Sequence, residues 1–365
     1  MITGSARLDA IPRYEPGLTS AEVAERYGLE TVVKLASNES PHGPLPAVSE
    51  AIAAAAIGLN RYPDGSARVL RAALANLHGV DAAQVIVGNG SGELILMAGQ
   101  ALLDPGTTVV YADPSFALYA TLASASGAEG IAVPLDGHGL HDLDAMAAEV
   151  DERTRLVIVC NPNNPTGTYI GAERLTAFLD SLPEDLPVLI DEAYNDFVTA
   201  PDRGRMMSLA RQRPNLLVTR TFSKAHGLPG LRVGFGVGGA GWIDALNRVR
   251  PPFNCNSLAQ VAAREALRHL TDLDTRVRQT ISERERVANA LGIMKLAFTP
   301  SHGNFILVQM SRDEGEAPSL HERLLRRGII VRNGASLGVP GRIRVSIGTP
   351  DENDAFLAAL AAEIA

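Results

Sequence analysis

Short apolar runs rich in β-branched residues alternate with helix-like segments between about residues 65 and 240, and this alternation most limits the folds open to the chain. The expected strands are residues 84–87, 108–111, 130–133, 156–160, 188–191, 216–219 and 232–236. Segments between them, such as 92–102 and 172–181, have apolar residues at i, i+3 and i+4. Strands that are apolar on both faces and separated by helices indicate a sheet covered on both sides. The pattern predicts an α/β fold with a mostly parallel seven-stranded sheet.

The pattern changes after about residue 255. Helical periods over 257–269 and 273–291 precede expected strands at 305–308, 329–332 and 343–347. A last helix follows, with Asp351 predicted as its N-cap because carboxylates favour the positive end of a helix dipole. We predict a large domain over residues 46–255 and a smaller α+β domain built from 1–45 and 256–365.

Composition excludes several classes of protein. The 365 residues carry a net charge of −8, and no basic block is interleaved with aromatic residues, so nucleic acid is not an expected partner. No run reaches the roughly 18 apolar residues of a membrane span, and the first 17 residues lack the apolar core of a signal peptide. Cys160 and Cys255 are too far apart to form a disulfide framework. We expect a cytoplasmic protein.

Polar clusters follow four of the expected strands, at residues 88–93, 161–166, 191–195 and 221–224. Ligands of open α/β sheets bind at the carboxyl ends of the strands. The recurrence therefore predicts one shared site.

Lys224 lies in the last of these clusters, beside Thr221 and Ser223 and eight residues before Arg232. An amine that can carry an aldehyde, together with hydroxyls and a guanidinium that can bind a phosphate, is what pyridoxal phosphate requires. A lone Ser-Lys pair in a glycine-rich loop is more often a surface feature, so the other clusters must supply partners.

Two other clusters offer those partners. Asp191, at the end of VLID, is placed to keep a pyridine nitrogen protonated, while Tyr194 and Asn161 are placed to hydrogen-bond the ring hydroxyl oxygen. Two of them have plainer explanations: an N-cap or loop anchor for Asp191, and a tight turn for the NPNNPTG run that Asn161 opens.

The remaining clusters supply a phosphate site and a ring contact. The glycine-rich turn at 88–92 lies between a strand and a helix, where backbone N–H groups can bind an anion. Its spacing does not match G-x-G-x-x-G, so a dinucleotide-binding dehydrogenase is not expected. Phe116, in DPSFALY, either stacks on the cofactor ring or belongs to the core.

Eight sequence motifs, four of which contain the polar clusters described above, follow one another along the chain in the order and with the spacing of a known enzyme family. They are KLASNESPHGP at 34–44, RYPD at 61–64, GNGSGE at 88–93, NPNNPTG at 161–167, DEAY at 191–194, TFSK at 221–224, GLRVGF at 230–235 and IRVSIGTPDEND at 343–354. Over nearly its whole length the chain resembles the fold-type I pyridoxal-phosphate aminotransferases, in the branch of the histidinol-phosphate aminotransferases. The resemblance implies transamination of L-histidinol phosphate with 2-oxoglutarate, a step of histidine biosynthesis.

The resemblance also implies a role for each cofactor-binding residue. Lys224 holds pyridoxal 5'-phosphate as a Schiff base and transfers the proton, Asp191 pairs with the ring nitrogen, and Asn161 and Tyr194 bind the ring oxygen. Lys224, Asp191 and Tyr194 form the predicted catalytic set. Phe116 stacks on the ring, and the cofactor phosphate is held by Ser91, Gly92, Glu93, Thr221, Ser223 and Arg232.

Further roles concern the partner subunit and the substrate. Tyr62 is implied to reach the cofactor phosphate of the other subunit, so a homodimer is expected. Arg344 is implied to bind the acid group of the small-molecule amino donor or 2-oxo acid, and Arg332 the phosphate of histidinol phosphate. Tyr14 and Asn38 complete the predicted substrate-binding set. An ordinary charge at a strand end is the alternative for Arg332.

The chain departs from the family pattern at Gly92, usually acidic, at His226, usually aromatic, at Pro229, usually alanine, and in the loop 332–341. His226 is either a packing substitution or a sign of a different side-chain pocket. These departures suit a specialised biosynthetic aminotransferase. An aromatic amino-acid aminotransferase is a second alternative, because such enzymes share the SNES and TFSK motifs, and a threonine-phosphate decarboxylase is a third, because it also uses a phosphorylated substrate. A non-enzymatic sensor on this fold is disfavoured by the presence of Lys224, Asp191 and Asn161.

Overall fold

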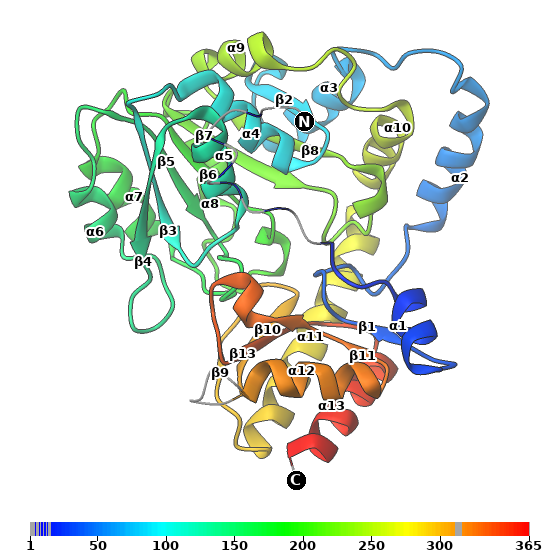
Figure 1. Ribbon diagram of the computed structural model, residues 1–365. Helices are drawn as coiled ribbons and strands as arrows, with labels where there is room; N and C mark the ends of the chain where they lie inside the picture. Colours follow the sequence, from blue (N-terminus) through cyan, green and yellow to red (C-terminus); the bar gives the residue numbers. More distant parts are fainter. Residues whose placement is uncertain are drawn as a thin grey trace.

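The computed structural model describes residues 4, 7, 9, 11, 13, 16–310 and 316–364. A seven-stranded sheet forms one part of the molecule, and a four-stranded sheet with a separate strand pair forms another. In Figure 1 the four-stranded sheet and the last helices, in orange and red, lie below the large sheet.

The large sheet has the strand order β2-β8-β7-β6-β5-β3-β4. Its strands are β2 (Val85–Gly88), β3 (Thr108–Asp113), β4 (Glu129–Pro134), β5 (Thr154–Cys160), β6 (Val188–Asp191), β7 (Leu216–Thr221) and β8 (Gly234–Gly238). The strands from β4 across to β7 are parallel, and β8 runs antiparallel to both β7 and β2. The predicted fold class, with a mostly parallel seven-stranded sheet, is confirmed.

The last strand of this sheet begins later than predicted. The short 3₁₀ helix η5 (Pro229–Leu231) precedes it, and Arg232 has a φ of 57°, which is incompatible with a strand. Strand β8 therefore starts at Gly234, not at Arg232.

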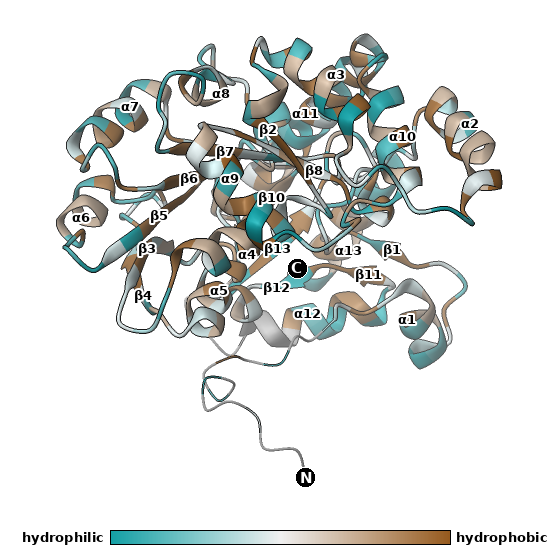
Figure 2. Cartoon of the chain, turned by 90° about the horizontal axis from the view of Figure 1, so that it is seen from above, coloured by the Kyte–Doolittle hydropathy of each residue, from teal (hydrophilic) through white to brown (hydrophobic). Residues whose placement is uncertain are grey.

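Both faces of the large sheet are buried, which explains its continuous apolar runs. Val157 and Val159 point into one core, whereas Leu156 and Ile158 point into the other. Figure 2 shows β5 and β6 in the brown of hydrophobic residues. The covering helices are α3 (Arg68–His78), α4 (Ser91–Leu102), α5 (Leu118–Ser126), α6 (Leu143–Ala148), α7 (Ala172–Ser181), α8 (Arg205–Leu209), α9 (Ala240–Val249) and α10 (Ser257–Ala266).

The smaller part contains an antiparallel sheet in the order β12-β13-β10-β9. These strands are β9 (Phe298–Thr299), β10 (Phe305–Gln309), β12 (Arg332–Asn333) and β13 (Arg342–Ser346). Beside it, β1 (Val33–Lys34) pairs in parallel with β11 (Ile329–Ile330). The predicted strand 329–332 is thus wrong as one element, because its two ends pair in different sheets. The helices here are α1 (Ser20–Tyr27), α11 (Leu270–Ile293), α12 (Glu316–Arg326) and α13 (Pro350–Ile364).

The start of α13 also differs from the prediction. Glu352 N donates to Thr349 Oγ1 at 3.3 Å, and Thr349 N donates to Glu352 Oε2 at 2.8 Å. This reciprocal pair is a capping box, so Thr349 caps the helix and Asp351 lies in its first turn. The acidic residues still favour the helix dipole.

The domain boundaries remain predictions, and one packing contact favours moving the second of them. Ala259, Ala262 and Ala263 of α10 belong to a core of the large sheet, and α10 packs against α2 (Pro46–Ala55). This favours a boundary near the start of α11 rather than at residue 256. Among the described residues, no helix is both long and apolar enough to cross a membrane.

Candidate active site

The predicted polar clusters meet at the carboxyl edge of the large sheet. Cys160, Asp191 and Thr219 are register partners on the neighbouring strands β5, β6 and β7. The segments that follow these strands therefore begin side by side, and the loop carrying Lys224 continues directly from β7. Four stretches distant in sequence form one site because parallel strands place all their carboxyl ends at one edge.

Lys224 lies in the loop after β7. Its Nζ donates to the carbonyl of Ser37 at 3.2 Å and lies 5.7 Å from the centre of the Tyr194 ring. Burial, followed by the positive charge of Arg344, lowers the pKa of Lys224 to about 8. A larger fraction of the amine is therefore neutral near neutral pH, as attack on an aldehyde requires.

Asp191, at the end of β6, is 3% exposed. Burial raises the pKa of its carboxyl to about 6, although hydrogen bonds from Tyr119, Ala193 and Thr219 oppose that shift. No described residue forms an ion pair with it. A buried carboxylate without a cationic partner fits a protonated pyridine nitrogen.

An anion cradle lies beside Lys224. The Thr221 hydroxyl donates to Ser223 Oγ at 3.0 Å, and Arg232 Nη1 donates to the same oxygen at 3.3 Å. The Arg232 guanidinium also packs against the start of α4. A Cβ added to Gly90 would lie 2.6 Å from Arg232 Nη2, so only glycine leaves room for it there. These hydroxyls, the guanidinium and the N-terminus of α4 fit a phosphate.

Three further predicted cofactor contacts differ in their surroundings. The carboxylate of Glu93 accepts from Asn89 N at 2.7 Å and from Asn254 Nδ2 at 2.6 Å, which leaves only the backbone of its turn for an anion. Phe116 is 38% exposed beside the site. Tyr62 is 82% exposed and stacks on Phe253, with 4.5 Å between the ring centres.

Tyr194 and Asn38 join the two parts of the molecule at the site. Asn38 Nδ2 donates to the Tyr194 hydroxyl at 3.0 Å, and Ser346 Oγ in β13 donates to Asn38 Oδ1 at 3.1 Å. Burial raises the pKa of Tyr194 to about 12. Tyr194 therefore keeps its proton and can donate to a ring oxygen.

Two of the three asparagines of the NPNNPTG loop lie near the site with different partners. Asn161 binds the backbone of Ile170 with both polar atoms of its side chain, since Oδ1 accepts at 2.8 Å and Nδ2 donates at 2.9 Å. It is 2% exposed and secures the loop, and its predicted contact with the ring oxygen stays a prediction. Asn164, which the sequence analysis missed, instead accepts a hydrogen bond from Arg344. Its place in Asn-Pro-Thr-Gly was the available signal.

Arg344 and Arg332 are neighbours in register on β13 and β12. Arg344 is 6% exposed, donates to the carbonyl of Ala36 at 3.0 Å, and has no partner for its Nε. Neither arginine forms an ion pair with any residue that the structure describes. Burial, with Arg332 contributing, lowers the pKa of Arg344 to about 10. Tyr14, the other predicted substrate contact, lies outside the described residues.

His226 has a packing role in the structure. Its ring lies 4.5 Å from that of Phe222, a fully buried core residue. Burial lowers the pKa of His226, so the ring is neutral near pH 7. Between the two alternatives for this departure, the contact with Phe222 favours a packing substitution.

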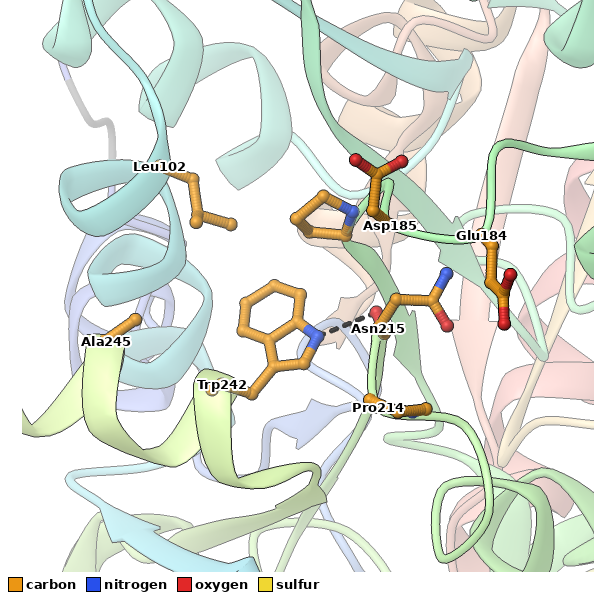
Figure 3. A pocket seen from close by; sticks show the side chains of 9 residues that line it. Leu102, Glu184, Asp185, Pro214, Asn215, Trp242 and Ala245 are labelled. Carbon is orange, nitrogen blue, oxygen red and sulfur yellow. Dashed lines mark hydrogen bonds between the residues drawn. The ribbon is translucent and has the colours of Figure 1, made fainter.

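A hollow of about 600 Å³ lies away from these residues. Pro187 and Asn215, at the amino ends of β6 and β7, line it together with Trp242, whose Nε1 donates to the Asn215 carbonyl at 2.7 Å (Figure 3). Lys224 follows the opposite end of β7. The hollow is therefore separate from the candidate active site.

Comparison with known proteins places the chain in a family. The family model for aminotransferase class I and II matches residues 30–360. A histidinol-phosphate aminotransferase of Geobacillus thermodenitrificans is 44% identical over 348 residues, covering 95% of this chain and 94% of the relative. Histidinol-phosphate aminotransferase 2 of Pseudomonas aeruginosa is 45% identical over 349 residues, with the same coverage of 95% and 94%.

Solved structures agree with this assignment. The histidinol-phosphate aminotransferase of Sinorhizobium meliloti, solved in complex with pyridoxal-5'-phosphate, superposes with a TM-score of 0.90 at 28% identity and covers 99% of this chain and 98% of its own. Aspartate aminotransferase of Thermus thermophilus, at 24% identity and a TM-score of 0.86 with full coverage of both chains, shares the fold.

The chain belongs to the class I and II aminotransferases. It is thus a pyridoxal-phosphate-dependent aminotransferase, which confirms the enzyme class and the cofactor predicted from its motifs. Within that family, the relatives that match it over nearly its full length are histidinol-phosphate aminotransferases.

Proposed function

We propose that this enzyme transaminates L-histidinol phosphate with 2-oxoglutarate, and thus serves histidine biosynthesis. The observation that carries the proposal is the pair of neighbouring arginines, Arg332 and Arg344, without a carboxylate partner among the described residues. Two unpaired guanidiniums fit a phosphate dianion, or the side-chain carboxylate of an acceptor acid, better than they fit an uncharged side chain.

The cofactor residues divide into four groups in this proposal, which bind the phosphate, the ring nitrogen, the ring face and the ring oxygen. Arg232, Ser223, Thr221 and the turn Ser91, Gly92 and Glu93 hold the cofactor phosphate. Asp191 binds the ring nitrogen, Phe116 covers the ring, and Tyr194 donates to the ring oxygen. We assign the second contact to that oxygen to Asn164 rather than Asn161, because both polar atoms of Asn161 bind the backbone.

Lys224 is the proposed base and acid. The bound cofactor supplies an electron sink that makes the Cα proton of the amino donor acidic. Lys224 Nζ would take the proton from this Cα and deliver it to the former aldehyde carbon of the bound cofactor. The depressed pKa of about 8 suits both directions, because proton transfer is most efficient when the pKa lies near the working pH.

We propose further that the enzyme acts as a homodimer in the cytoplasm. Tyr62 and Ile57, which are 82% and 93% exposed, lie in a stretch that also exposes Leu59. Exposed apolar residues grouped in this way favour a protein interface. Tyr62 then reaches the phosphate of the partner subunit's cofactor.

The buried free cysteines Cys160 and Cys255 are compatible with a reducing compartment.

The test compares amino donors with and without a phosphate. Histidinol phosphate, histidinol, phenylalanine, tyrosine and threonine phosphate are assayed with 2-oxoglutarate, and kcat/KM is measured for each. We expect histidinol phosphate to be the best donor. A preference for phenylalanine or tyrosine would point to the aromatic enzymes, and carbon dioxide release from threonine phosphate would point to the decarboxylase.

The arginine assignment is tested separately. Arg332→Ala should lower kcat/KM for histidinol phosphate by about 10- to 100-fold, the usual effect of losing a hydrogen bond to a charged group, and change that for histidinol little. Arg342→Ala is the matched control, since Arg342 is on the same sheet but donates to Gln309. Equal losses for both donors would contradict a phosphate role for Arg332.

A further inference from the structure

A buried tyrosine lies behind the carboxylate that is proposed to hold the cofactor ring. The hydroxyl of Tyr119 donates to Asp191 Oδ2 at 3.0 Å, and Tyr119 is 1% exposed. The other donors to this carboxylate, Ala193 N at 3.2 Å and Thr219 Oγ1 at 3.4 Å, bind Oδ1. Among the described residues, Tyr119 thus gives the side-chain carboxylate of Asp191 its shortest hydrogen bond and its one bond to Oδ2.

The first turn of α5 connects this tyrosine to the proposed ring contact. Tyr119 N donates to the carbonyl of Phe116 at 3.0 Å, and the two rings meet edge to face with centres 5.8 Å apart. Phe116 is partly exposed beside the site, whereas Tyr119 is buried beneath it. One turn therefore carries a side chain for the face of the cofactor and a donor for the carboxylate that binds its nitrogen.

Packing alone does not explain the hydroxyl. A phenylalanine would fill the same space in the core around Leu122 and Ile158, and burying a hydroxyl is unfavourable unless it is hydrogen-bonded. Burial, the charge of Asp191 and the neighbouring Cys160 thiol all raise the pKa of Tyr119. Its proton is therefore retained and is always available to the carboxylate.

We propose that Tyr119 is a positioning residue that keeps Asp191 ionised and oriented toward the ring nitrogen of pyridoxal phosphate. A donor to a carboxylate favours its charged form, and burial favours the neutral one. An ionised Asp191 keeps the ring nitrogen protonated, which the electron sink requires. The inference rests on the proposed cofactor site but not on the identity of the amino donor.

The test compares two cofactors in two variants. Tyr119→Phe removes only the hydroxyl, and Tyr111→Phe is the matched control, because Tyr111 packs 6.3 Å from the Tyr119 ring and has no hydrogen bond to Asp191. Dissociation constants are measured by absorbance titration for pyridoxal phosphate and for the deaza analogue in which carbon replaces the ring nitrogen. The pyridoxal phosphate titration is repeated from pH 5 to 9.

We expect Tyr119→Phe to weaken pyridoxal phosphate about tenfold and to shift the acid limb of its binding profile upward by about one pH unit, with the analogue unaffected. Tyr111→Phe should change neither. Thr219→Val removes the longer bond to Oδ1. It should also weaken the binding of pyridoxal phosphate and not that of the analogue, but by a smaller factor, and it replaces Tyr119→Phe in the test if that variant does not fold.

Equal weakening of cofactor and analogue, or no weakening of either, would overturn the positioning role. Failure of the wild-type protein to bind pyridoxal phosphate would instead overturn the proposed cofactor site. The two failures are thus distinguishable.

Discussion

Two buried arginines near the site contrast sharply in their partners. Arg220, on β7, donates twice to Glu192 Oε2, at 2.9 and 2.7 Å, and the two side chains are 16% and 4% exposed. Arg344, on β13, is only 6% exposed but forms no ion pair with any described residue and leaves its Nε unbonded. A buried charge that the chain itself neutralises serves the structure. A buried charge left unpaired is available to a ligand.

Asp191 extends the contrast to carboxylates. It lies directly before Glu192 in sequence, yet Glu192 has Arg220 as a partner, whereas the described donors to the Asp191 carboxylate are all neutral. The unpaired charges destabilise the protein without ligands, as is common where stability is exchanged for function. Variants of the paired charges should therefore lose stability, whereas variants of the unpaired charges should keep their stability and lose ligand binding or activity.

The largest expected effect is on the ligand-binding side. Lys224→Ala should abolish transamination and leave no lysine that borohydride can trap with pyridoxal phosphate, because Lys224 is the predicted Schiff-base lysine and Lys34 is already paired with Glu39. Peptide mass spectrometry after reduction locates the adduct. Lys295→Ala is the control and should retain both activity and adduct. A trapped adduct on another lysine in Lys224→Ala would refute the assignment.

The next effect is on the structural side. Arg220→Met leaves Glu192 buried without a partner and should lower the free energy of unfolding by about 3–5 kcal/mol. Denaturant titration of the cofactor-free protein measures the change. A loss below 1 kcal/mol would show that this ion pair contributes no more than an exposed one.

Asp191 should show a smaller effect of opposite sign. Its pKa is raised from the usual value to about 6 in the folded protein, so the folded state binds the extra proton between about pH 4 and 6. This group therefore reduces stability as the pH rises through that window. In Asp191→Asn, the cofactor-free protein should be more stable than wild type by up to about 3 kcal/mol above pH 6, with little difference near pH 4.

Urea unfolding of wild type and Asp191→Asn at several pH values tests this expectation. The variant should also bind pyridoxal phosphate more weakly, which separates stability from function. A variant that is less stable than wild type at pH 8 would mean that neutral donors fully compensate the buried charge.

The smallest expected effect completes the comparison. Arg344→Met removes a charge that has no counter-ion among the residues that the structure describes, so the cofactor-free enzyme should keep its stability within about 1 kcal/mol. Activity with 2-oxoglutarate should nevertheless fall. Comparison of its unfolding curve with that of Arg220→Met is the direct measure of the contrast. Similar losses in both variants would remove the distinction between the two arginines.

Sequence reasoning succeeded where one local pattern decides the outcome. The seven strands of the large sheet follow from apolar runs that are buried on both faces, as Leu156 and Val157 illustrate in opposite cores. The prediction from sequence was wrong where contacts with other residues determine where a strand or helix begins and ends. The run 329–332 is divided between two sheets because Ile330 pairs with Lys34, whereas Arg332 pairs with Arg344. Thr349 rather than Asp351 caps the last helix because Glu352 reaches back to it.

The same limit applies within the site. The NPNNPTG run indicated that an asparagine matters, but only the fold shows that Ile170 occupies the amide of Asn161 while Arg344 contacts Asn164. Nothing in the sequence near Tyr119 connects it to Asp191, because their bond joins residues 72 positions apart.

By itself, the sequence determined the layered α/β architecture, the family and the chemical type of the site, because periodicity and motif residues are local properties that the chain carries wherever it folds. Only the tertiary structure decided which charges are neutralised and which are left for ligands. Two charges pair only when the fold brings strands and loops that are far apart in sequence within a few ångströms of each other. Burial then determines how strongly the two charges interact.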